Sequence, residues 1–316
     1  MRWSALACAA VLAAAAHAAE DAAVSVAVNP VRVSEHVWYV ESLPGPAAPE
    51  NEGHIANAGF VVTREGVVVF DALGSPPLAR ELLRRIRAIT DQPVLRVIVS
   101  HYHADHIYGL QVFKAAGAEI WAHRAGSAYL GSDEARDRLE QRRQILFPWI
   151  DESTRLVPPD RWLDGDVDFE LGGVRFLVRH VGPAHTAEDL ALMVRPDGVL
   201  FAGDLVFRGR VPFVGTADSK AWLASLERLL ALEPKVLVPG HGPASDAPAD
   251  ELGLTRDYLA YLRRTMGAAA ADFVPFEEAY AATSWRRFEH LPAFKDANRL
   301  NAYNTYLLME REQLAR

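Results

Sequence analysis

Six consecutive residues carry an unusual density of groups that bind metal ions. The segment His101-Tyr102-His103-Ala104-Asp105-His106 presents three imidazoles and one carboxylate directly after the apolar run 95–100. Imidazole nitrogens and carboxylate oxygens are the ligands that divalent transition metals prefer in proteins. So many of these groups in six residues are unusual both for a solvent-exposed surface and for a packed hydrophobic core. The segment therefore predicts a metal site at the end of a strand.

Four further candidate ligands each lie where a predicted strand ends in a loop. They are Asp71, His185, Asp204 and His241, and the last lies in a Pro-Gly-His-Gly sequence. Strand ends on one rim of a sheet can converge although they are far apart in the chain, and glycines beside Asp204 and His241 allow the backbone to turn sharply. A set with open coordination positions leaves room for bound water. We therefore expect these side chains and the histidine segment to converge on one metal centre.

Without Asp71, the seven candidate ligands resemble, in order and spacing, the ligand set of the metallo-β-lactamase superfamily, and the resemblance runs from about residue 31 to 245. It implies an α/β fold, a four-layer αβ/βα sandwich with two zinc ions in the groove between the sheet edges. It implies that His101, His103 and His185 hold one ion, that Asp105, His106 and His241 hold the other, and that Asp204 bridges them.

The same resemblance implies a hydrolase that attacks an ester, thioester, lactone or cyclic amide with a metal-bridging hydroxide. Two ions about 3.5 to 4 Å apart would bring the pKa of a shared water toward about 7 and polarise the carbonyl under attack. Asp105 could accept the hydroxide proton while it ligates, and carry it to the leaving group. Asp105 is thus the expected catalytic residue, and the partner is a small-molecule substrate.

Two positions depart from the zinc β-lactamase branch with a thiol ligand, which the segments 182–189 and 215–218 otherwise resemble. Asp204 stands where that branch has its cysteine, and Phe207 stands at the place of the lysine that grips the antibiotic carboxylate. Weak or promiscuous β-lactamase activity is therefore an alternative. The Asp204 version is more similar to exported metallohydrolases associated with quinoprotein relay and sulfur-oxidation systems.

Other functions use the same residues. A persulfide dioxygenase of the superfamily would hold a single iron with His101, His185 and Asp204, so iron is an alternative to zinc. The diiron oxygen-reducing branch is disfavoured, because His103 occupies the position that this branch gives to glutamate. A metal-binding or redox-partner module without catalysis is the non-enzyme alternative.

Four residues are candidates for supporting the centre or lining its pocket. Asp71 ends a strand, and we expect it to orient the histidine loop by hydrogen bonds. His54 and Asn57 close the Pro- and Gly-rich loop 41–53, which reads as a lid or as a disordered segment. His123 follows a strand end, and an ordinary hydrogen-bonded core position is its alternative.

Hydrophobic periodicity predicts the elements that must position these residues. Ser75 caps a helix that runs to Pro93, and Asp133 caps a charged helix over 131–147 with Leu139, Ile145 and Leu146 on its inner side. A third helix covers 219–232, and the chain is wholly helical after Asp250. Strands are expected at 31–40, 59–63, 67–70, 95–100, 119–122, 167–171, 174–180, 190–194, 199–202 and 236–238.

The N-terminal residues read as a signal peptide over 1–19. Arg2 supplies the positive end, Ala5 to Ala16 is apolar, and Ala16-His17-Ala18 is a small-x-small cleavage site. The only cysteine, Cys8, lies inside this peptide, so the mature chain would have neither a disulfide nor a thiolate ligand. We expect a periplasmic or secreted protein with no membrane span.

Length and charge bound the remaining possibilities. The chain has 316 residues and a formal net charge of −8, which offers no broad basic surface to nucleic acid. We expect a metallo-β-lactamase-like domain over 20–248 and a helical C-terminal extension over 249–316 packed on it. Trp222, Tyr258, Tyr303 and Tyr306 follow helical spacing and read as core, with a homodimer face as the alternative.

Overall fold

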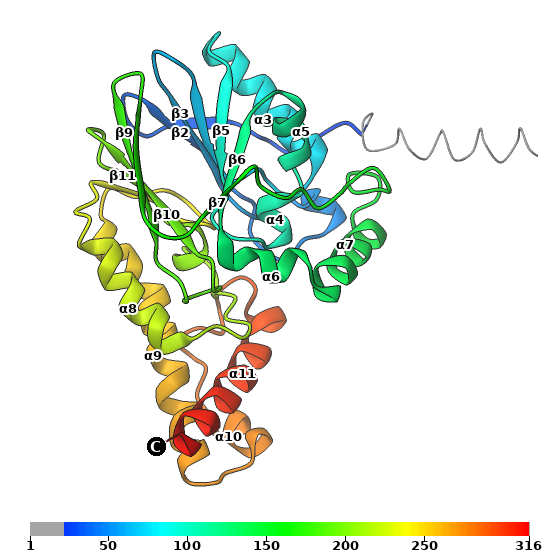
Figure 1. Ribbon diagram of the computed structural model, residues 1–316. Coiled ribbons are helices and arrows are strands. Elements are labelled where there is room, and N and C mark those ends of the chain that lie inside the picture. The colour runs from blue at the N-terminus through cyan, green and yellow to red at the C-terminus, as the bar shows by residue number, and fades with distance from the viewer. Residues whose placement is uncertain (1–21, 316) are drawn as a thin grey trace, which may run out of the picture.

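The computed structural model describes residues 22–315, and the expected signal peptide lies outside them. Two sheets stand face to face with helices on their outer sides (Figure 1). The first sheet contains β1 (Pro30–Arg32), β2 (Val37–Val40), β3 (Ala58–Val62), β4 (Val67–Phe70), β5 (Val94–Ile98), β6 (Glu119–His123) and β7 (Arg161–Leu163). The second contains β8 (Val167–Leu171), β9 (Val174–His180), β10 (Leu190–Arg195), β11 (Val199–Phe201) and β12 (Val236–Val238).

The helices are α3 (Pro76–Ile89), α4 (Ala104–Ile107), α5 (Leu110–Ala115), α6 (Ser127–Leu130), α7 (Asp133–Ile145), α8 (Ser219–Leu230), α9 (Pro248–Ala271), α10 (Phe276–Ala282) and α11 (Phe294–Leu314). Short 3-10 turns η1 (Pro49–Asn51), η2 (Arg124–Gly126) and η3 (Gly203–Leu205) complete the elements. No helix between residues 22 and 315 is long and apolar enough to cross a membrane.

Both sheets mix antiparallel and parallel pairs. In the first, β1 to β4 pair as antiparallel neighbours, and β4, β5, β6 and β7 follow in parallel. In the second, β8 to β11 are antiparallel, and β12 joins β11 in parallel. In the parallel pairs the carboxyl ends of neighbouring strands lie at the same edge of the sheet. The loops that follow β4, β5, β11 and β12, which contain candidate site residues, therefore start at that edge.

Strand alternation builds three buried layers. In β4, Val67 and Val69 pack under the helices, whereas Val68 and Phe70 face the second sheet. In β10, Ala191 and Met193 pack toward α8 and α9, and the alternate residues Leu190, Leu192 and Val194 face the first sheet. Side chains of successive strand residues point to opposite faces, so each sheet contributes to two cores. The prediction of a four-layer αβ/βα sandwich is confirmed.

Two details of the charged helix were predicted wrongly. Ser132, and not Asp133, is the N-cap of α7, because its hydroxyl accepts a hydrogen bond from the Ala135 backbone N–H. Ile145 is 37% exposed although Leu139 and Leu146 are buried. It comes six residues after Leu139, and at 3.6 residues per turn this places it on a different side of the helix. Ser75 caps α3 as expected, accepting from Leu78 N–H. Strand β7 had no recognisable pattern in the sequence.

In the helical C-terminal region α9 packs against α8, and α10 and α11 pack on α9 beyond the end of the sheets (Figure 1). Asn301 of α11 accepts a hydrogen bond from Val214 N–H and donates one to the Pro212 carbonyl, at 2.9 and 2.7 Å. Trp222, Tyr258 and Tyr306 are buried as predicted, but Tyr303 is 43% exposed. The extension therefore holds the segment 210–214, which borders the candidate site.

Candidate metal centre

Two strand ends fix the histidine segment. Asp71 directly follows β4, and its backbone N–H donates to the Ile98 carbonyl at the end of β5. The Ser100 carbonyl accepts from Leu190 N–H, which ties the end of β5 to the start of β10 in the other sheet. His103 then caps α4, so the imidazoles and Asp105 leave one tight turn between the sheets.

The structure brings His101, His103, His185 and Asp204 together as one group of potential ligands. His103 Nδ1 lies 3.0 Å from His101 Nε2 and 2.9 Å from His185 Nε2. Asp204 Oδ2 lies 3.5 Å from His185 Nε2 and 3.9 Å from His101 Nε2. Ligands about 2.0 to 2.1 Å from a zinc ion are roughly 3 Å apart, so this spacing suits one ion.

Asp105, His106 and His241 form a second group beside the first. Asp105 Oδ2 lies 3.8 Å from His106 Nε2 and 3.6 Å from His241 Nε2. Asp204 Oδ1 lies 3.1 Å from the Nε2 atoms of both His106 and His241. Asp204 therefore stands between the two groups, with one oxygen near each.

The protonation of the imidazoles follows from their outer partners. Ser100 Oγ donates its single hydrogen to Asp71 Oδ2 at 2.7 Å, so it accepts from His101 Nδ1 at 2.9 Å. His106 Nδ1 donates to the same Asp71 oxygen at 2.8 Å, and His241 Nδ1 donates to the Ile55 carbonyl. Each Nε2 atom then turns a lone pair into the site.

Lone pairs that face a carboxylate oxygen need a cation between them. His106 Nε2 and Asp204 Oδ1 are buried without a hydrogen-bond donor among the described residues, although they lie 3.1 Å apart. Buried polar atoms without partners are rare in proteins and point to an ion, a water or a functional role. The donor set of five imidazoles and two carboxylates fits a pair of divalent ions such as zinc.

Burial and charge set the ionisation of the ligands. Burial lowers the pKa of His101, His103 and His185, that of His185 to about 3, so these rings stay neutral. Burial opposes ionisation of Asp204 and Asp105, but neighbouring imidazoles outweigh it and lower the pKa of both carboxyls.

His106 behaves differently from the other histidines. Burial opposes its protonation, yet the carboxylates of Asp204 and Asp71 raise its pKa well above the ordinary value. A cation at His106 is thus strongly favoured, whether a proton or a metal ion.

Asn57 holds the turn that carries His241. Its amide donates to the Pro239 and Gly242 carbonyls, both at 2.8 Å, and its side-chain oxygen accepts from Ser42 N–H. Asn57 was a candidate for supporting the centre or for lining its pocket; it is 4% exposed and holds the backbone that carries His241.

Phe207 completes the surroundings of His241. Its ring stacks on the imidazole, with centroids 4.8 Å apart and planes 7° apart. An apolar ring therefore covers a ligand at the position where the resemblance places a cation.

His54 and His123 are not among the converging side chains. His54 is fully buried, and neither ring nitrogen has a hydrogen-bond partner within residues 22–315. His123 stacks on His180, with centroids 3.6 Å apart, and its Nδ1 accepts from Ala125 N–H. Burial and the neighbouring His180 lower the pKa of His123 to about 4.

Several residues near the site had no signal in the sequence analysis. Ser100 links Asp71 to His101, and the Asp189 carboxylate fixes the His185 turn by accepting from Thr186 N–H and Oγ1, both at 2.7 Å. Arg210 places Nη1 3.4 Å from His241 Nδ1. Only the last could have been noticed, as a basic residue shortly after Asp204.

Two aromatic side chains mark the open side of the centre. His103 and Asp105 are the only ligands of the seven that are partly exposed. Tyr129 of α6 and Phe213 lie edge-on to the His103 ring, with centroids 6.5 and 6.1 Å away. Both aromatic residues are themselves half-buried.

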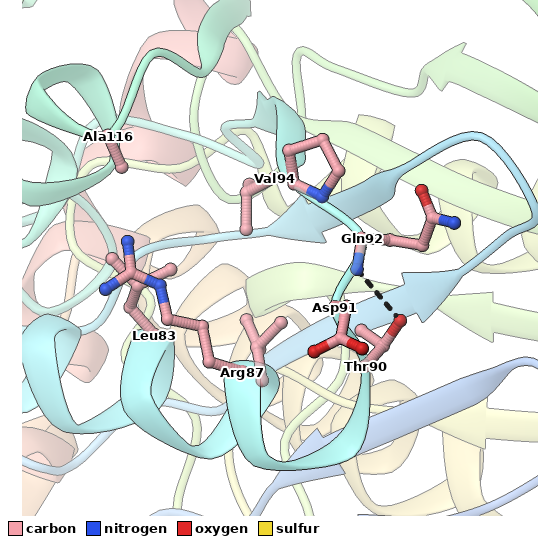
Figure 2. A pocket seen from close by; sticks show the side chains of 9 residues that line it. Leu83, Arg87, Thr90, Asp91, Gln92, Val94 and Ala116 are labelled. Atoms are coloured by element: carbon pink, nitrogen blue, oxygen red, sulfur yellow. Dashed lines mark hydrogen bonds between the residues drawn. The ribbon is translucent and has the colours of Figure 1, made fainter.

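A separate hollow of about 400 Å³ lies where α3 ends and β5 begins (Figure 2). Arg87, Asp91 and Gln92 contribute its polar groups, and Gln92 N–H donates to Thr90 Oγ1 at 3.1 Å. The ligands follow the other end of β5. This hollow is therefore no part of the metal centre.

Known proteins share the fold and about a quarter of the aligned sequence. A family model described as the metallo-beta-lactamase superfamily matches residues 51–241. The linear primary-alkylsulfatase of a Pseudomonas species is 27% identical over 238 residues, covering 63% of this chain and 44% of the relative. The metallo-beta-lactamase type 2 of Elizabethkingia meningoseptica is 26% identical over 201 residues, covering 62% and 72%.

Among solved structures, a metallo-beta-lactamase from Pontibacter korlensis superposes with a TM-score of 0.60 at 24% identity, covering 74% of this chain and 99% of that one. The chain spans less than half the length of the alkylsulfatase. The matched segment 51–241 contains all seven converging side chains, and the named relatives are hydrolases. The chain therefore belongs to the metallo-β-lactamase superfamily.

Proposed function

We propose that this protein is an exported binuclear zinc hydrolase that cleaves an ester, a thioester, a lactone or a cyclic amide. The observation that carries the proposal is the position of Asp204, with Oδ2 3.5 Å from His185 Nε2 and Oδ1 3.1 Å from His106 and His241 Nε2. A carboxylate so placed can bridge two ions. When bound, two zinc ions would lower the pKa of a shared water to about 7 and polarise the carbonyl under attack.

The side chains of the site would bind the ions and transfer the proton. His101, His103 and His185 would hold one ion, and Asp105, His106 and His241 the other. Hydrolysis consumes one water, breaks the bond between the carbonyl carbon and the leaving group, and transfers one proton. Asp105 is partly exposed on the open side, and its lowered pKa keeps it ionised. We assign it the acceptance of the proton from the attacking water and its delivery to the leaving group.

Substitution of the ligands tests the proposal. Asp105→Asn and His241→Ala should abolish turnover of a responsive ester or lactone while the circular dichroism spectrum is retained. His290→Ala, at an exposed position, is the matched control and should keep full activity. Full turnover by protein stripped of metal would contradict the proposal.

A sulfate ester is a second candidate substrate, because one of the similar curated proteins is an alkylsulfatase. A panel of esters, thioesters, lactones, β-lactams and alkyl sulfates separates the reactions. The Asp204 and Phe207 positions predict that β-lactams are poor substrates. Release of inorganic sulfate with no acyl hydrolysis would favour the second candidate over the first.

Metal analysis of protein purified without added metal decides between zinc and iron. About two zinc ions per chain are expected for binuclear hydrolysis. One iron per chain with oxygen uptake on a persulfide would favour the dioxygenase, with His101, His185 and Asp204 as its ligands. In that case Asp105→Asn should leave the metal content unchanged.

Export and assembly complete the proposal. N-terminal sequencing of protein from the periplasm or the medium should begin near Ala19, whereas a mature chain that still contains Cys8 would contradict export by this leader. Homodimerisation would use the face of α11 where Leu300 and Tyr303 are 47% and 43% exposed. Light scattering gives the molar mass that decides it.

A further inference from the structure

Two histidine rings stack between the two sheets. His123 is the last residue of β6 in the first sheet, and His180 is the last residue of β9 in the second. The ring centroids lie 3.6 Å apart, and the ring planes are 9° apart. β6 pairs in parallel with β5, whose end leads into the histidine segment, and the turn that carries His185 follows β9. The pair therefore lies at the sheet edge where the candidate ligands converge.

Each ring also forms a hydrogen bond with a backbone group. His123 Nδ1 accepts from Ala125 N–H at 3.3 Å and thereby caps the turn η2. His180 Nε2 lies 3.0 Å from the Ala187 carbonyl, which can only accept, so this nitrogen carries a hydrogen and donates. A single hydrogen bond leaves a ring free to rotate about it, whereas a stacking partner fixes the plane of the ring. The stack and the two hydrogen bonds together hold both rings in one orientation.

His180 supports the turn that carries His185. The Asp189 carboxylate accepts from Thr186 N–H and Oγ1, both at 2.7 Å, and the His180 ring holds the Ala187 carbonyl of the next residue. Side chains therefore hold the two residues that directly follow a candidate ligand. The orientation of the His180 ring determines where the second of them lies.

His123 supports the segment 124–130, which packs against two other loops of the site. Gly126 lies so close to Tyr102 of the histidine segment that an added Cβ would come within 2.7 Å of the ring. The same Cβ would lie 3.4 Å from Cγ of Glu188, which belongs to the turn after β9. Glu188 Oε1 in turn accepts from Tyr102 N–H at 3.3 Å. A shift of the segment 124–130 would therefore be passed on to both loops that carry ligands.

We propose that His123 and His180 are positioning residues for the metal centre. Their stack holds the segment 124–130 and the turn 181–189 in fixed positions relative to each other, and thereby sets the zinc affinity of the group that contains His185. A ligand whose backbone is held in advance loses less conformational freedom when a metal ion binds, so the ion binds more tightly. The inference rests on the proposed function only for the presence of zinc ions.

Zinc titration tests the inference without hydrolysis. Chelator competition on the metal-free full chain should give two zinc dissociation constants, of which His185→Ala removes the one for its group. His180→Phe keeps a ring for the stack but loses the donor to Ala187, and His123→Ala loses the stack. Each should weaken that constant by about tenfold, the lower end of the effect of losing an outer partner of a ligand. His123→Phe restores a ring and should bring the constant back to within about twofold of the wild-type value.

A double variant tests whether the two histidines act as one unit. If they do, His123→Ala combined with His180→Phe should weaken the constant by about tenfold, as each single change does, because either one already releases the turn. Independent effects would multiply to about a hundredfold. A hundredfold loss would contradict the inference.

Amide hydrogen exchange of the metal-free full chain measures the two segments directly. His123→Ala should raise exchange at 124–130 and at 186–188, because the stack holds both. His180→Phe should raise it at 186–188 alone, and His123→Phe at Ala125 but not at 186–188. Unchanged exchange at 186–188 in His123→Ala would show that the stack does not reach the turn, and would overturn the inference.

His36→Ala is the matched control. His36 also links a turn of the first sheet to one of the second, since its Nδ1 lies 2.9 Å from Asp197 Oδ1, but it does so at the opposite end of β10 from His180. Both zinc constants and the exchange at 124–130 and 186–188 should keep their wild-type values in this variant.

The outcomes separate this inference from the proposed function. Wild-type zinc constants in His123→Ala and His180→Phe would limit the pair to a structural role and overturn the inference. Zinc constants that respond as expected in a chain that hydrolyses nothing would overturn the proposed function alone. A wild type that binds no zinc would also contradict the proposed function, and hydrogen exchange would then decide whether the pair holds the two segments.

Discussion

The Asp71 carboxylate accepts a hydrogen bond from His106 Nδ1 at 2.8 Å and another from Ser100 Oγ at 2.7 Å, and Ser100 in turn orients His101. The Asp71 backbone has a positive φ of 62°. Through these hydrogen bonds the Asp71 side chain fixes the tautomer of His101 in one group of candidate ligands and that of His106 in the other. Asp71 therefore acts on both groups of candidate ligands and belongs to neither.

Asp71 Oδ1 also accepts from Ser100 N–H at 2.7 Å, so the carboxylate takes three hydrogen bonds in all. Asp71→Asn should weaken zinc binding, because an amide has a single oxygen and can neither accept all three hydrogen bonds nor favour the Nδ1-protonated rings. Loss of such a partner typically costs about 10- to 100-fold in metal affinity. Chelator competition measures the effect. The control is Asp197→Asn, since Asp197 Oδ1 pairs with His36 Nδ1 at 2.9 Å far along the chain from the ligands. An unchanged zinc affinity in Asp71→Asn would show that the hydrogen bonds of Asp71 do not contribute to zinc binding.

Gly240→Ala should disturb Asp204 specifically. A Cβ at residue 240 would overlap Asp204 Oδ1 and approach the carbonyl carbon of Gly203 to 2.6 Å. The carboxylate between the two metal groups would have to move, so we expect loss of the second zinc ion with little change in secondary structure. Gly165→Ala is the control, because a Cβ there meets no atom within 4 Å. Retention of two zinc ions by Gly240→Ala would contradict the expectation.

The convergence of the seven candidate ligands was predictable because its signal is local. Three imidazoles and Asp105 follow one apolar strand, and His185, Asp204 and His241 each follow another, so strand ends alone indicate convergence. The same holds for β4 and β10, whose alternation reveals which residues face which layer. The register of strong periodic elements is written in the sequence.

The supporting residues were not predictable in the same way. Arg210 lies beside His241 only because the segment after Asp204 folds back under the loop 41–53, where it meets Gly45. Tyr129 and Phe213 meet His103 from two elements whose separation in the chain carries no pattern. Asn57 faces Pro239 and Gly242 across 182 and 185 residues. Such contacts depend on tertiary packing, which short-range hydrophobic periodicity does not predict.

His54 should make stability fall in mild acid. Burial lowers its pKa to about 4 in the folded protein, whereas an unfolded histidine titrates near 6.5. Below pH 6.5 the unfolded chain binds a proton that the folded chain refuses, so stability declines as pH falls from about 6.5 to about 4. The full difference amounts to about 3 kcal/mol.

His54→Leu removes this dependence, and urea unfolding at pH 7 and pH 5 measures it. The loss of unfolding free energy between the two pH values should be smaller in the variant than in the wild type. His290→Leu, at an exposed position, should behave as the wild type does. Identical pH dependence in all three proteins would mean that His54 becomes charged without penalty.

Phe213→Ala should alter selectivity for apolar chains. Phe213 lies beside His103 and His185, with ring centroids 6.1 and 6.4 Å away, and Asn301 holds the backbone on either side of it. Each buried methylene contributes about 0.8 kcal/mol, or roughly fourfold in affinity. The wild type should therefore prefer 4-nitrophenyl butyrate to the acetate, and Phe213→Ala should flatten that preference by raising KM for the longer chain.

Asn301→Ala tests whether the extension sets this wall from a distance. Without the Asn301 side chain, Val214 N–H and the Pro212 carbonyl lose their partners, and the Phe213 backbone is free to shift. We expect the chain-length preference to weaken as in Phe213→Ala while both zinc constants stay at wild-type values. Thr283→Ala, whose hydroxyl donates to the Ala279 carbonyl one turn earlier in the chain, serves as the control in the same helical region. If Asn301→Ala kept the full preference for butyrate, the extension would stabilise the fold without shaping the site.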